Sequence, residues 1–324
     1  MAHLTGKSGY KKLIDRYNEF PHKAPESETL YEILKILFDK EEASLVSLLP
    51  IKPFNVNQAS KIWNKSKKET KDILENLAKK ALILDMNDNS EQKYVVPPPM
   101  IGFFEFTLMR TGGSFDQKLL SELFHQYLEI EEDFMKELLS LDTPVGRILV
   151  NEESIDKNQK TYVLDYEKAT SIIKNAENIG VSRCYCRHKA QHLNKACDAP
   201  QEVCLSINNL SLSLSKHGYA RLIDTNEALN ILKLAYDHNL VQFAENVKEG
   251  VGFICNCCSC CCVALKGARK MGVPQTISSS NFIAKIKDTC VNCGKCIKVC
   301  PMGCFEFKIE LESNKVILDE SLCL

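Results

Sequence analysis

Residues 255–262 read CNCCSCCC, which places six cysteines within eight positions. The chain has 16 cysteines among 324 residues, and none of them precedes Cys184. Its N-terminal stretch, MAHLTGKSGYKK, is polar and lacks an apolar signal core, and no apolar run reaches the roughly 18 residues that a membrane span requires. We therefore expect a cytoplasmic protein without a membrane span, whose cysteines are metal ligands or redox thiols rather than disulfides.

The composition suits a chain with a sizeable core. Hydrophobic residues make up 44% of the sequence, and the formal net charge is -1. This length and hydrophobicity predict two or three domains. The nearly balanced charge offers no electrostatic basis for general binding to nucleic acid or to a membrane surface.

The first 100 residues predict a small domain of helices followed by a hairpin. Residues 27–49 carry apolar side chains at a helical spacing. Two further helices are expected near residues 57–64 and 67–80, and residues 82–96 read as two strands around a polar turn. This order is typical of a winged helix-turn-helix domain, so we assign residues 1–100 a winged-helix-like fold.

The helix near residues 67–80 leaves two roles open for this domain. Lysines that suit contacts with DNA phosphates lie in or just before the helix: Lys65, Lys67, Lys68 and Lys71. The same helix also carries Glu69, Asp72 and Glu75, which weaken its positive potential. DNA binding is therefore possible, but we favour a solvated lysine face on a domain used for protein contacts.

Residues 101–180 read as a bridging α/β segment. Helices are expected within residues 117–141 and 166–178. The segment has no glycine-rich phosphate loop and no Ser-His-Asp set. Any chemistry is therefore expected downstream, in residues 181–275 and 281–324.

The most specific motif is CVNCGKCIKVCP at residues 290–301. Its cysteines are Cys290, Cys293, Cys296 and Cys300, and their spacing, C-x2-C-x2-C-x3-C-P, is typical of [4Fe-4S] ligands in bacterial ferredoxins. A zinc site is the alternative, but zinc sites seldom combine three evenly spaced cysteines with a following Cys-Pro. We expect Cys290, Cys293 and Cys296 to bind one cluster and Cys300 to serve a second one.

Residues 281–324 resemble the two-cluster bacterial ferredoxin domain. The second cysteine run of that family is missing, and the chain ends one residue after Cys323, where this run would open. The resemblance therefore implies a truncated domain in which Cys290, Cys293 and Cys296 need a fourth ligand, while Cys300 and Cys323 form half of a second site. Cys304 stands where the family has a small residue, and we expect it to serve packing, with a substitute ligand as the alternative.

Two further groups of cysteines precede this run. The first group is Cys184, Cys186, Cys197 and Cys204, which lie among basic residues that favour thiolates. The second group is Cys255, Cys257, Cys258, Cys260, Cys261 and Cys262. One cubane takes four ligands, so we expect residues 255–262 to serve more than one metal centre and to share ligands with the first group. Cys255, Cys258 and Cys261 repeat the ferredoxin spacing, while zinc and inert buried thiols are the alternatives.

The second half of the chain resembles a family of cytoplasmic [4Fe-4S] ferredoxin-type iron-sulfur binding proteins of anaerobic prokaryotes. The stretches that carry the resemblance are CYCRHK at 184–189, CDAP at 197–200, HGYARLID at 217–224, FICNCCSCCC at 253–262 and the run at 290–301. FFEFTLMR at 103–110 and the N-terminal domain fit the same family. The resemblance implies cluster binding and electron transfer, and it implies little about a substrate.

The expected fold is α+β and multidomain. It comprises a winged-helix-like domain at 1–100, a bridging α/β segment at 101–180, a helical Cys-rich cluster domain at 181–275 and a ferredoxin-like module at 281–324. We favour an electron-transfer protein or redox subunit that carries two or more [4Fe-4S] clusters and has a redox partner protein. The alternatives are an iron-sulfur redox sensor that regulates transcription and an oxidoreductase with an open-site cluster.

Overall fold

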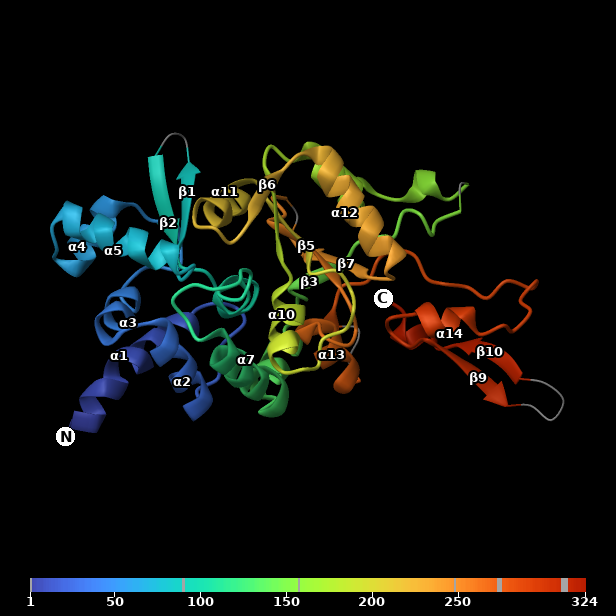
Figure 1. Ribbon diagram of the computed structural model, residues 1–324, viewed down its shortest axis with the longest axis horizontal. Helices are drawn as coiled ribbons and strands as arrows, with labels where there is room; N and C mark the ends of the chain where they lie inside the picture. Colours follow the sequence, from blue (N-terminus) through green and yellow to red (C-terminus); the bar gives the residue numbers. More distant parts are fainter. Residues whose placement is uncertain (1, 89–90, 157, 248, 273–275, 310–313) are drawn as a thin grey trace.

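The computed structural model describes residues 2–88, 91–156, 158–247, 249–272, 276–309 and 314–324. The chain has a mixed α/β fold with three sheets in the described residues, two of them two-stranded and one six-stranded. The N-terminal helices and the C-terminal hairpin lie at opposite ends of the long axis, with the six-stranded sheet between them (Figure 1). Among the described residues, none of the helices combines the length and the apolar character that crossing a bilayer requires.

The N-terminal part consists of helices and one antiparallel hairpin. Its elements are α1 (Ala2–Tyr17), α2 (Glu28–Leu37), α3 (Lys40–Val46), α4 (Val56–Trp63), α5 (Lys67–Lys79), β1 (Leu84–Asp88) and β2 (Glu91–Val95). The segment predicted to be helical over 27–49 forms two helices, because Asp39 begins α3 with a capping box to Glu42. Residues 89 and 90 of the predicted polar turn lie outside the described residues.

The middle of the chain is helical up to residue 139. Its elements are η1 (Pro99–Phe103), α6 (Phe104–Phe106), α7 (Gln117–His125), η2 (Gln126–Ile130) and α8 (Asp133–Leu139). The aromatic rings of Phe104, Phe124 and Phe134 pack edge to face in its core. These contacts fix the 103–110 stretch against α7 and α8, and this stretch reaches the cysteines described below.

The six-stranded sheet is built from strands that are widely separated in sequence. They are β3 (Gly146–Ile148), β4 (Ile179–Arg183), β5 (Glu202–Ile207), β6 (Arg221–Ile223), β7 (Val241–Glu245) and β8 (Phe253–Cys257). The order is β3-β7-β8-β5-β4-β6, and each neighbouring pair is antiparallel. The Cys-rich part is thus centred on a sheet, whereas a helical domain was expected. The reason is that Cys204, Cys255 and Cys257 lie in short, mostly buried runs, which favour strands of a central sheet over helices.

The sheet includes residues on both sides of the expected boundary near residue 180. Strand β3 comes from the 101–180 segment and pairs with β7, so the bridging and Cys-rich parts share one sheet. Helices of this region are α9 (Ala169–Asn175), α10 (Tyr185–His192), α11 (Asn208–Lys216), α12 (Thr225–Asp237) and α13 (Val263–Lys270). Helices α11 and α12 pack on β4 and β5.

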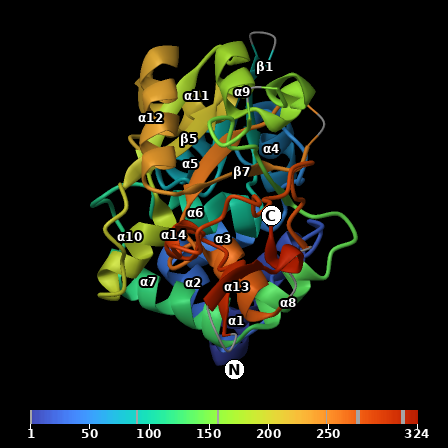
Figure 2. The ribbon, with the colours of Figure 1, turned by 90° about the vertical axis from the view of Figure 1, so that its right-hand side faces the viewer.

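The C-terminal part is a small separate layer. It consists of α14 (Lys295–Val299), the antiparallel pair β9 (Phe305–Ile309) and β10 (Asn314–Leu318), and the turn η6 (Glu320–Leu322). Viewed along the long axis, α14 and the C-terminus lie in front of the central sheet (Figure 2). A hydrogen bond of 2.9 Å from Asn281 Nδ2 to Glu167 Oε1 fastens the linker that leads to this part.

Candidate metal-binding site

Six cysteines converge at one end of the central sheet because five elements end or pass there. Cys204 lies in β5. Cys255 and Cys257 are two residues apart in β8, so their side chains point to the same face of the sheet. Cys184 follows β4 directly and is the N-cap of α10, whose first turn contains Cys186. Cys262 is the N-cap of α13. A β-bulge at Ser182–Arg183 re-aims the chain just before Cys184.

These six thiols form a closed ring. Each thiol neighbours two others, in the order Cys184, Cys186, Cys262, Cys257, Cys255, Cys204 and back to Cys184. Five of them are buried, and Cys255 is of intermediate exposure. We call this set the thiol ring.

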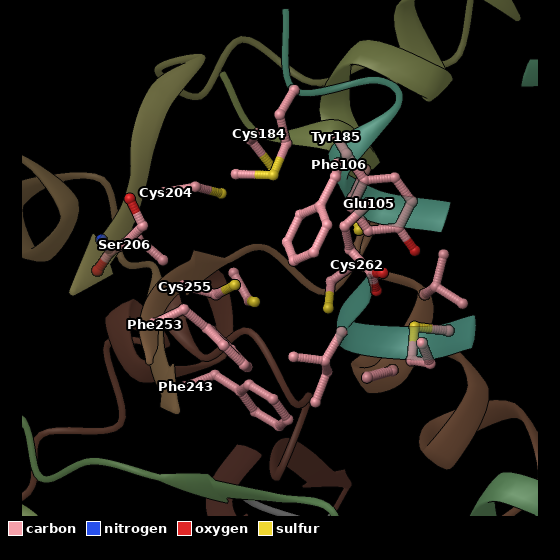
Figure 3. Close-up of a pocket in the computed structure, with 18 of the residues that line it drawn as sticks. Glu105, Phe106, Cys184, Tyr185, Cys204, Ser206, Phe243, Phe253, Cys255 and Cys262 are labelled. Atoms are coloured by element: carbon pink, nitrogen blue, oxygen red, sulfur yellow. The ribbon is translucent and has the colours of Figure 1, made fainter. Parts of the chain in front are cut away.

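The thiol ring borders a cavity of about 100 Å³. One bound water needs roughly 10–15 Å³ on this scale, so the space is several times larger than a single water. Figure 3 shows Cys184, Cys204, Cys255 and Cys262 projecting into the cavity, with Phe243 and Phe253 beside them. The remaining wall comes mainly from apolar side chains, which exclude water and lower the local dielectric.

One buried cation faces the sulfur atoms. Arg187 is 0% exposed, and its Nη1 lies 3.6 Å from Cys258 Sγ. Its Nη2 donates a hydrogen bond of 3.1 Å to the carbonyl of Asn256. Burial acts to lower the pKa of Arg187, but the thiols of Cys184, Cys204 and Cys258 outweigh burial and raise it. A charged guanidinium thus offsets negative charge on the surrounding sulfurs.

Two helix N-termini add positive potential at the same place. Helices α10 and α13 begin at Cys184 and Cys262, which are both members of the thiol ring. The unpaired N–H groups of a first helical turn and the helix dipole favour negative charge there. The pKa of Cys184 is lowered well below its usual value by hydrogen bonds with Cys186 and Cys204. Burial raises the pKa of Cys186 well above its usual value.

Several buried polar atoms at the ring lack a protein partner. Among the described residues these include Arg187 Nε and Asn256 Oδ1. Arg187 Nε is a donor, and a buried donor is costly unless an acceptor is present. Inorganic sulfide in a bound cluster is such an acceptor, so this donor and the thiols fit an iron-sulfur group.

A carboxyl group also lines the cavity, on the same side as Cys262 and Tyr185 (Figure 3). Glu105 accepts a hydrogen bond of 2.9 Å from the backbone N–H of Gly102, and it lies near Tyr185 in Figure 3. Burial raises the pKa of Glu105 to about 7, against the backbone N–H groups that act to lower it. Glu105 can therefore hold or release a proton near neutral pH. The FFEFTLMR stretch contained this residue, but its chemistry was not predicted.

The other basic residues of α10 do not face the sulfur. Lys189 is 1% exposed and forms an ion pair with Glu129. His188 Nδ1 lies 2.8 Å from the carbonyl oxygen of Leu108, so this side chain bonds to the 103–110 stretch. Of the basic residues near Cys184 and Cys186, Arg187 alone is described in contact with a cysteine sulfur.

A second group, which we call the cysteine quartet, consists of Cys197, Cys258, Cys260 and Cys261. Their four Sγ atoms all lie within 4.8 Å of one another. Cys197 Sγ is 3.7 Å from Cys258 Sγ and 3.9 Å from Cys261 Sγ, and the Sγ atoms of Cys260 and Cys261 are 3.8 Å apart. The quartet can hold a metal ion.

The C-terminal cysteines gather around Cys304. Its buried thiol neighbours those of Cys300 and Cys323, which raise its pKa. Cys304 lowers the pKa of Cys300 to about 5 and that of Cys323 to about 6. Cys290 and Cys293 are exposed, and Cys296 is of intermediate exposure. Cys304 is buried, as a packing residue would be, and it also lies between two predicted ligands.

The cysteines thus form groups in space that differ from the groups predicted from their order in the sequence. Residues 255–262 divide between two groups, and each group includes cysteines from 184–204, as shared ligands require. The three cysteines of residues 255–262 that repeat the ferredoxin spacing do not form one group. Cys255 belongs to the ring, whereas Cys258 and Cys261 belong to the quartet. Comparison with known proteins finds no matching family model, curated protein or solved structure.

Proposed function

We propose that this protein is an iron-sulfur electron-transfer protein or redox subunit, and that the thiol ring holds one of its clusters. The closed ring of six thiols around a largely apolar cavity carries this proposal. A bound [4Fe-4S] group would accept and donate single electrons. It takes four thiolates, so the ring contains more than enough ligands, drawn from residues 184–204 and 255–262.

The residues around the ring suit a redox site. Arg187 and the N-termini of α10 and α13 place positive charge beside the sulfurs, which stabilises the additional electron of a reduced cluster. The aromatic side chains of Phe106, Phe243 and Phe253 limit contact with water. Glu105 lies beside Cys262, and its pKa of about 7 allows it to hold or release a proton near neutral pH.

We assign a second cluster to the C-terminal module, residues 281–324. Cys290, Cys293 and Cys296 keep the ferredoxin spacing, and the module ends in an antiparallel hairpin. The neighbouring thiols of Cys300, Cys304 and Cys323 offer candidates for the fourth ligand. With two centres, electrons would pass between the thiol ring, the module and a redox partner protein.

The test combines chemical analysis with spectroscopy on anaerobically purified full-length protein. We expect iron and acid-labile sulfide in equal amounts, at about eight of each per chain for two cubanes. Reduction by dithionite should then produce EPR signals of interacting clusters. Equal amounts of iron and sulfide near four per chain would leave one cluster, and zinc without sulfide would contradict the proposal.

A pair of variants on one strand assigns the cluster to the ring. Cys204→Ser removes a ring thiol, whereas Ser206→Ala changes a cavity residue two positions further along β5. We expect Cys204→Ser to lose up to about four iron and four sulfide atoms per chain. Ser206→Ala should retain them. Full iron and sulfide in Cys204→Ser would show that the ring does not need this ligand.

A redox-sensing regulator is the second candidate, and one observation favours it. In the N-terminal part, Phe54 forms an antiparallel bridge with Tyr94 of β2 in the hairpin, on the edge of β2 that faces away from β1, and this extra extended segment supports a winged-helix interpretation. Strand β1 of this hairpin contacts α11, the helix that follows β5 and Cys204. A change at the ring therefore has a short structural route to the N-terminal domain.

Fluorescence anisotropy with a duplex DNA library measures this alternative under anaerobic conditions. A sensor should bind selected sequences, and the affinity should change when the cluster is reduced. Lys65 already pairs with Glu41 and Glu69, which reduces the positive charge available to DNA. Equal and weak binding in both redox states would exclude the regulator and leave electron transfer.

A further inference from the structure

We infer that the cysteine quartet binds a single zinc ion, separate from the cluster proposed for the thiol ring. This ion would connect the loop at residues 193–201 to residues 255–262. Cys197 comes from the connection between α10 and β5, while Cys258, Cys260 and Cys261 come from residues 255–262. This site goes beyond the proposed electron-transfer function and does not depend on it.

The distances between the sulfur atoms favour one ion over a polynuclear cluster. Four sulfurs at about 2.3 Å from a tetrahedral zinc ion lie about 3.8 Å from one another. Three pairs in the quartet are 3.7, 3.8 and 3.9 Å apart, and all pairs are within 4.8 Å. In a cubane each thiolate binds a different iron atom, so its four thiolates lie further apart than ligands of one ion.

The ring and the quartet also differ in arrangement. In the ring, each thiol neighbours two others around an open space, which suits a group with several metal atoms. In the quartet, every sulfur is close to the other three. Four protein thiolates complete a tetrahedron and leave no open position, which is the arrangement of structural zinc sites.

The local sequence supports the same assignment. Cys258 and Cys261 have the C-x2-C spacing that zinc sites use. The backbone N–H of Cys262 donates a hydrogen bond of 3.2 Å to the carbonyl of Cys258, which closes a tight turn around the ligands. Arg187 Nη1, at 3.6 Å from Cys258 Sγ, offsets part of the negative charge of a tetrathiolate site. Cys260 is exposed, so an ion reaches the site from solvent.

A matched pair of variants in residues 255–262 tests this site. Cys260→Ser removes the exposed ligand with little disturbance of the core, and Ser259→Ala changes the adjacent residue without removing a thiol. Zinc, iron and sulfide are measured per chain on full-length protein purified anaerobically. We expect wild type and Ser259→Ala to contain about one zinc per chain. Cys260→Ser should lose most of this zinc and keep its iron and sulfide.

Replacement of the ion in the wild-type protein gives a second readout. Cobalt(II) added after removal of zinc should show the intense visible absorption of a tetrahedral tetrathiolate site, and Cys260→Ser should lose this spectrum. Trypsin should also cleave after Lys195 several-fold faster in the zinc-free protein, because the loop is no longer fastened. These results identify the ion and its mechanical role without any activity assay.

Several results would overturn the inference. Joint loss of iron and sulfide in Cys260→Ser would place the quartet in a cluster, and iron without sulfide at this site would indicate a mononuclear iron centre. Full zinc in Cys260→Ser would mean that the ion lies elsewhere. Failure of the ring proposal is distinguishable, because Cys204→Ser would then leave iron and sulfide unchanged while zinc still depends on Cys260.

Discussion

At the scale of single residues, Arg187 is the group that links the two sulfur sites. Its guanidinium is fully buried, lies 3.6 Å from Cys258 Sγ in the quartet, and interacts with Cys184 and Cys204 in the ring. A buried cation raises the reduction potential of a nearby centre, because it stabilises the added electron. The same charge reduces the repulsion between two anionic sites that share one end of the sheet.

Arg187→Gln should therefore make the ring cluster harder to reduce. Loss of one charge with an interaction worth about 1–2 kcal/mol corresponds to a drop in midpoint potential of about 50–100 mV. A potentiometric titration followed by EPR measures the shift. Arg183→Gln is the matched control, since the described contact of this arginine is with Gln191 at 3.2 Å. An unchanged potential in Arg187→Gln with full iron content would contradict this role.

The ion pair between Lys189 and Glu129 provides a second prediction at this scale. Lys189 is almost fully buried, so Glu129→Gln leaves its charge without a counter-ion and should destabilise α10 by about 3 kcal/mol. Hydrogen exchange of the α10 amides measures the loss. Glu132→Gln, which breaks a more exposed pair with Lys270, should have a much smaller effect, because solvent screens this pair. Equal effects of the two variants would refute the argument.

The same pair predicts how stability depends on pH. Burial acts to raise the pKa of Glu129, but Lys189 and Lys266 outweigh it and lower the pKa to about 2. A carboxyl group with a lowered folded-state pKa stabilises the protein above its unfolded value, near 4.3, and this contribution is lost as the pH falls towards 2. The α10 amides of wild type should lose protection in this range. Glu129→Gln should show a smaller change.

At the scale of secondary structure, the contact between β1 and α11 joins the N-terminal domain to the sheet. Asp85 of β1 is buried and accepts hydrogen bonds from Ser213 at 2.8 Å and Lys216 at 2.5 Å. His217 Nε2 lies 3.0 Å from the same carboxyl group. Burial raises the pKa of Asp85, but His217, Lys216 and Ser213 together hold it below its usual range.

Asp85→Asn should loosen this contact. We expect a loss of about 1–3 kcal/mol, seen as faster hydrogen exchange in β1 and α11. Because the folded-state pKa is lowered, the wild-type contact should also weaken as the pH falls below about 4, whereas the variant should change less. Asp72→Asn on the exposed side of α5 serves as the control. Unaltered exchange in Asp85→Asn would mean that apolar packing alone holds the hairpin.

The positions of helices could be predicted from the sequence at this scale, but which cysteines lie next to one another could not. Apolar periodicity located α4 and α5 to within a residue or two at each end, since their buried faces follow the helical repeat. The ring depends instead on strand pairing between distant segments. Cys204 meets Cys255 because Leu205 pairs with Ile254 in β5 and β8, and a local sequence pattern does not specify that register.

At the scale of the whole molecule, the cysteines occupy three places rather than one. The ring and the quartet share the end of the central sheet, and the C-terminal module lies beyond that sheet on the long axis. The uneven distribution of cysteines along the chain predicted that chemistry belongs to the second half. It did not predict that a strand from residues 146–148 would complete the supporting sheet.

Separate centres should lose their metal independently. Cys296→Ser in the C-terminal module and Cys204→Ser in the ring should each remove up to about four iron atoms, and the double variant should remove the sum. Iron and sulfide analysis of the four proteins measures this. A double variant that loses no more than either single variant would indicate one shared centre.

The thiol ring has a consequence for the order of events during synthesis of the protein on the ribosome. Its thiols run along the chain from Cys184 to Cys262, and strands β5 and β8, which carry Cys204, Cys255 and Cys257, lie between these two ends. If the ring holds a cluster as proposed, insertion of that cluster has to wait until Cys262 has been synthesised and these strands have paired. Until then the thiols of the nascent chain are open to oxidation, so the proposal implies that the cluster is delivered before oxygen reaches them.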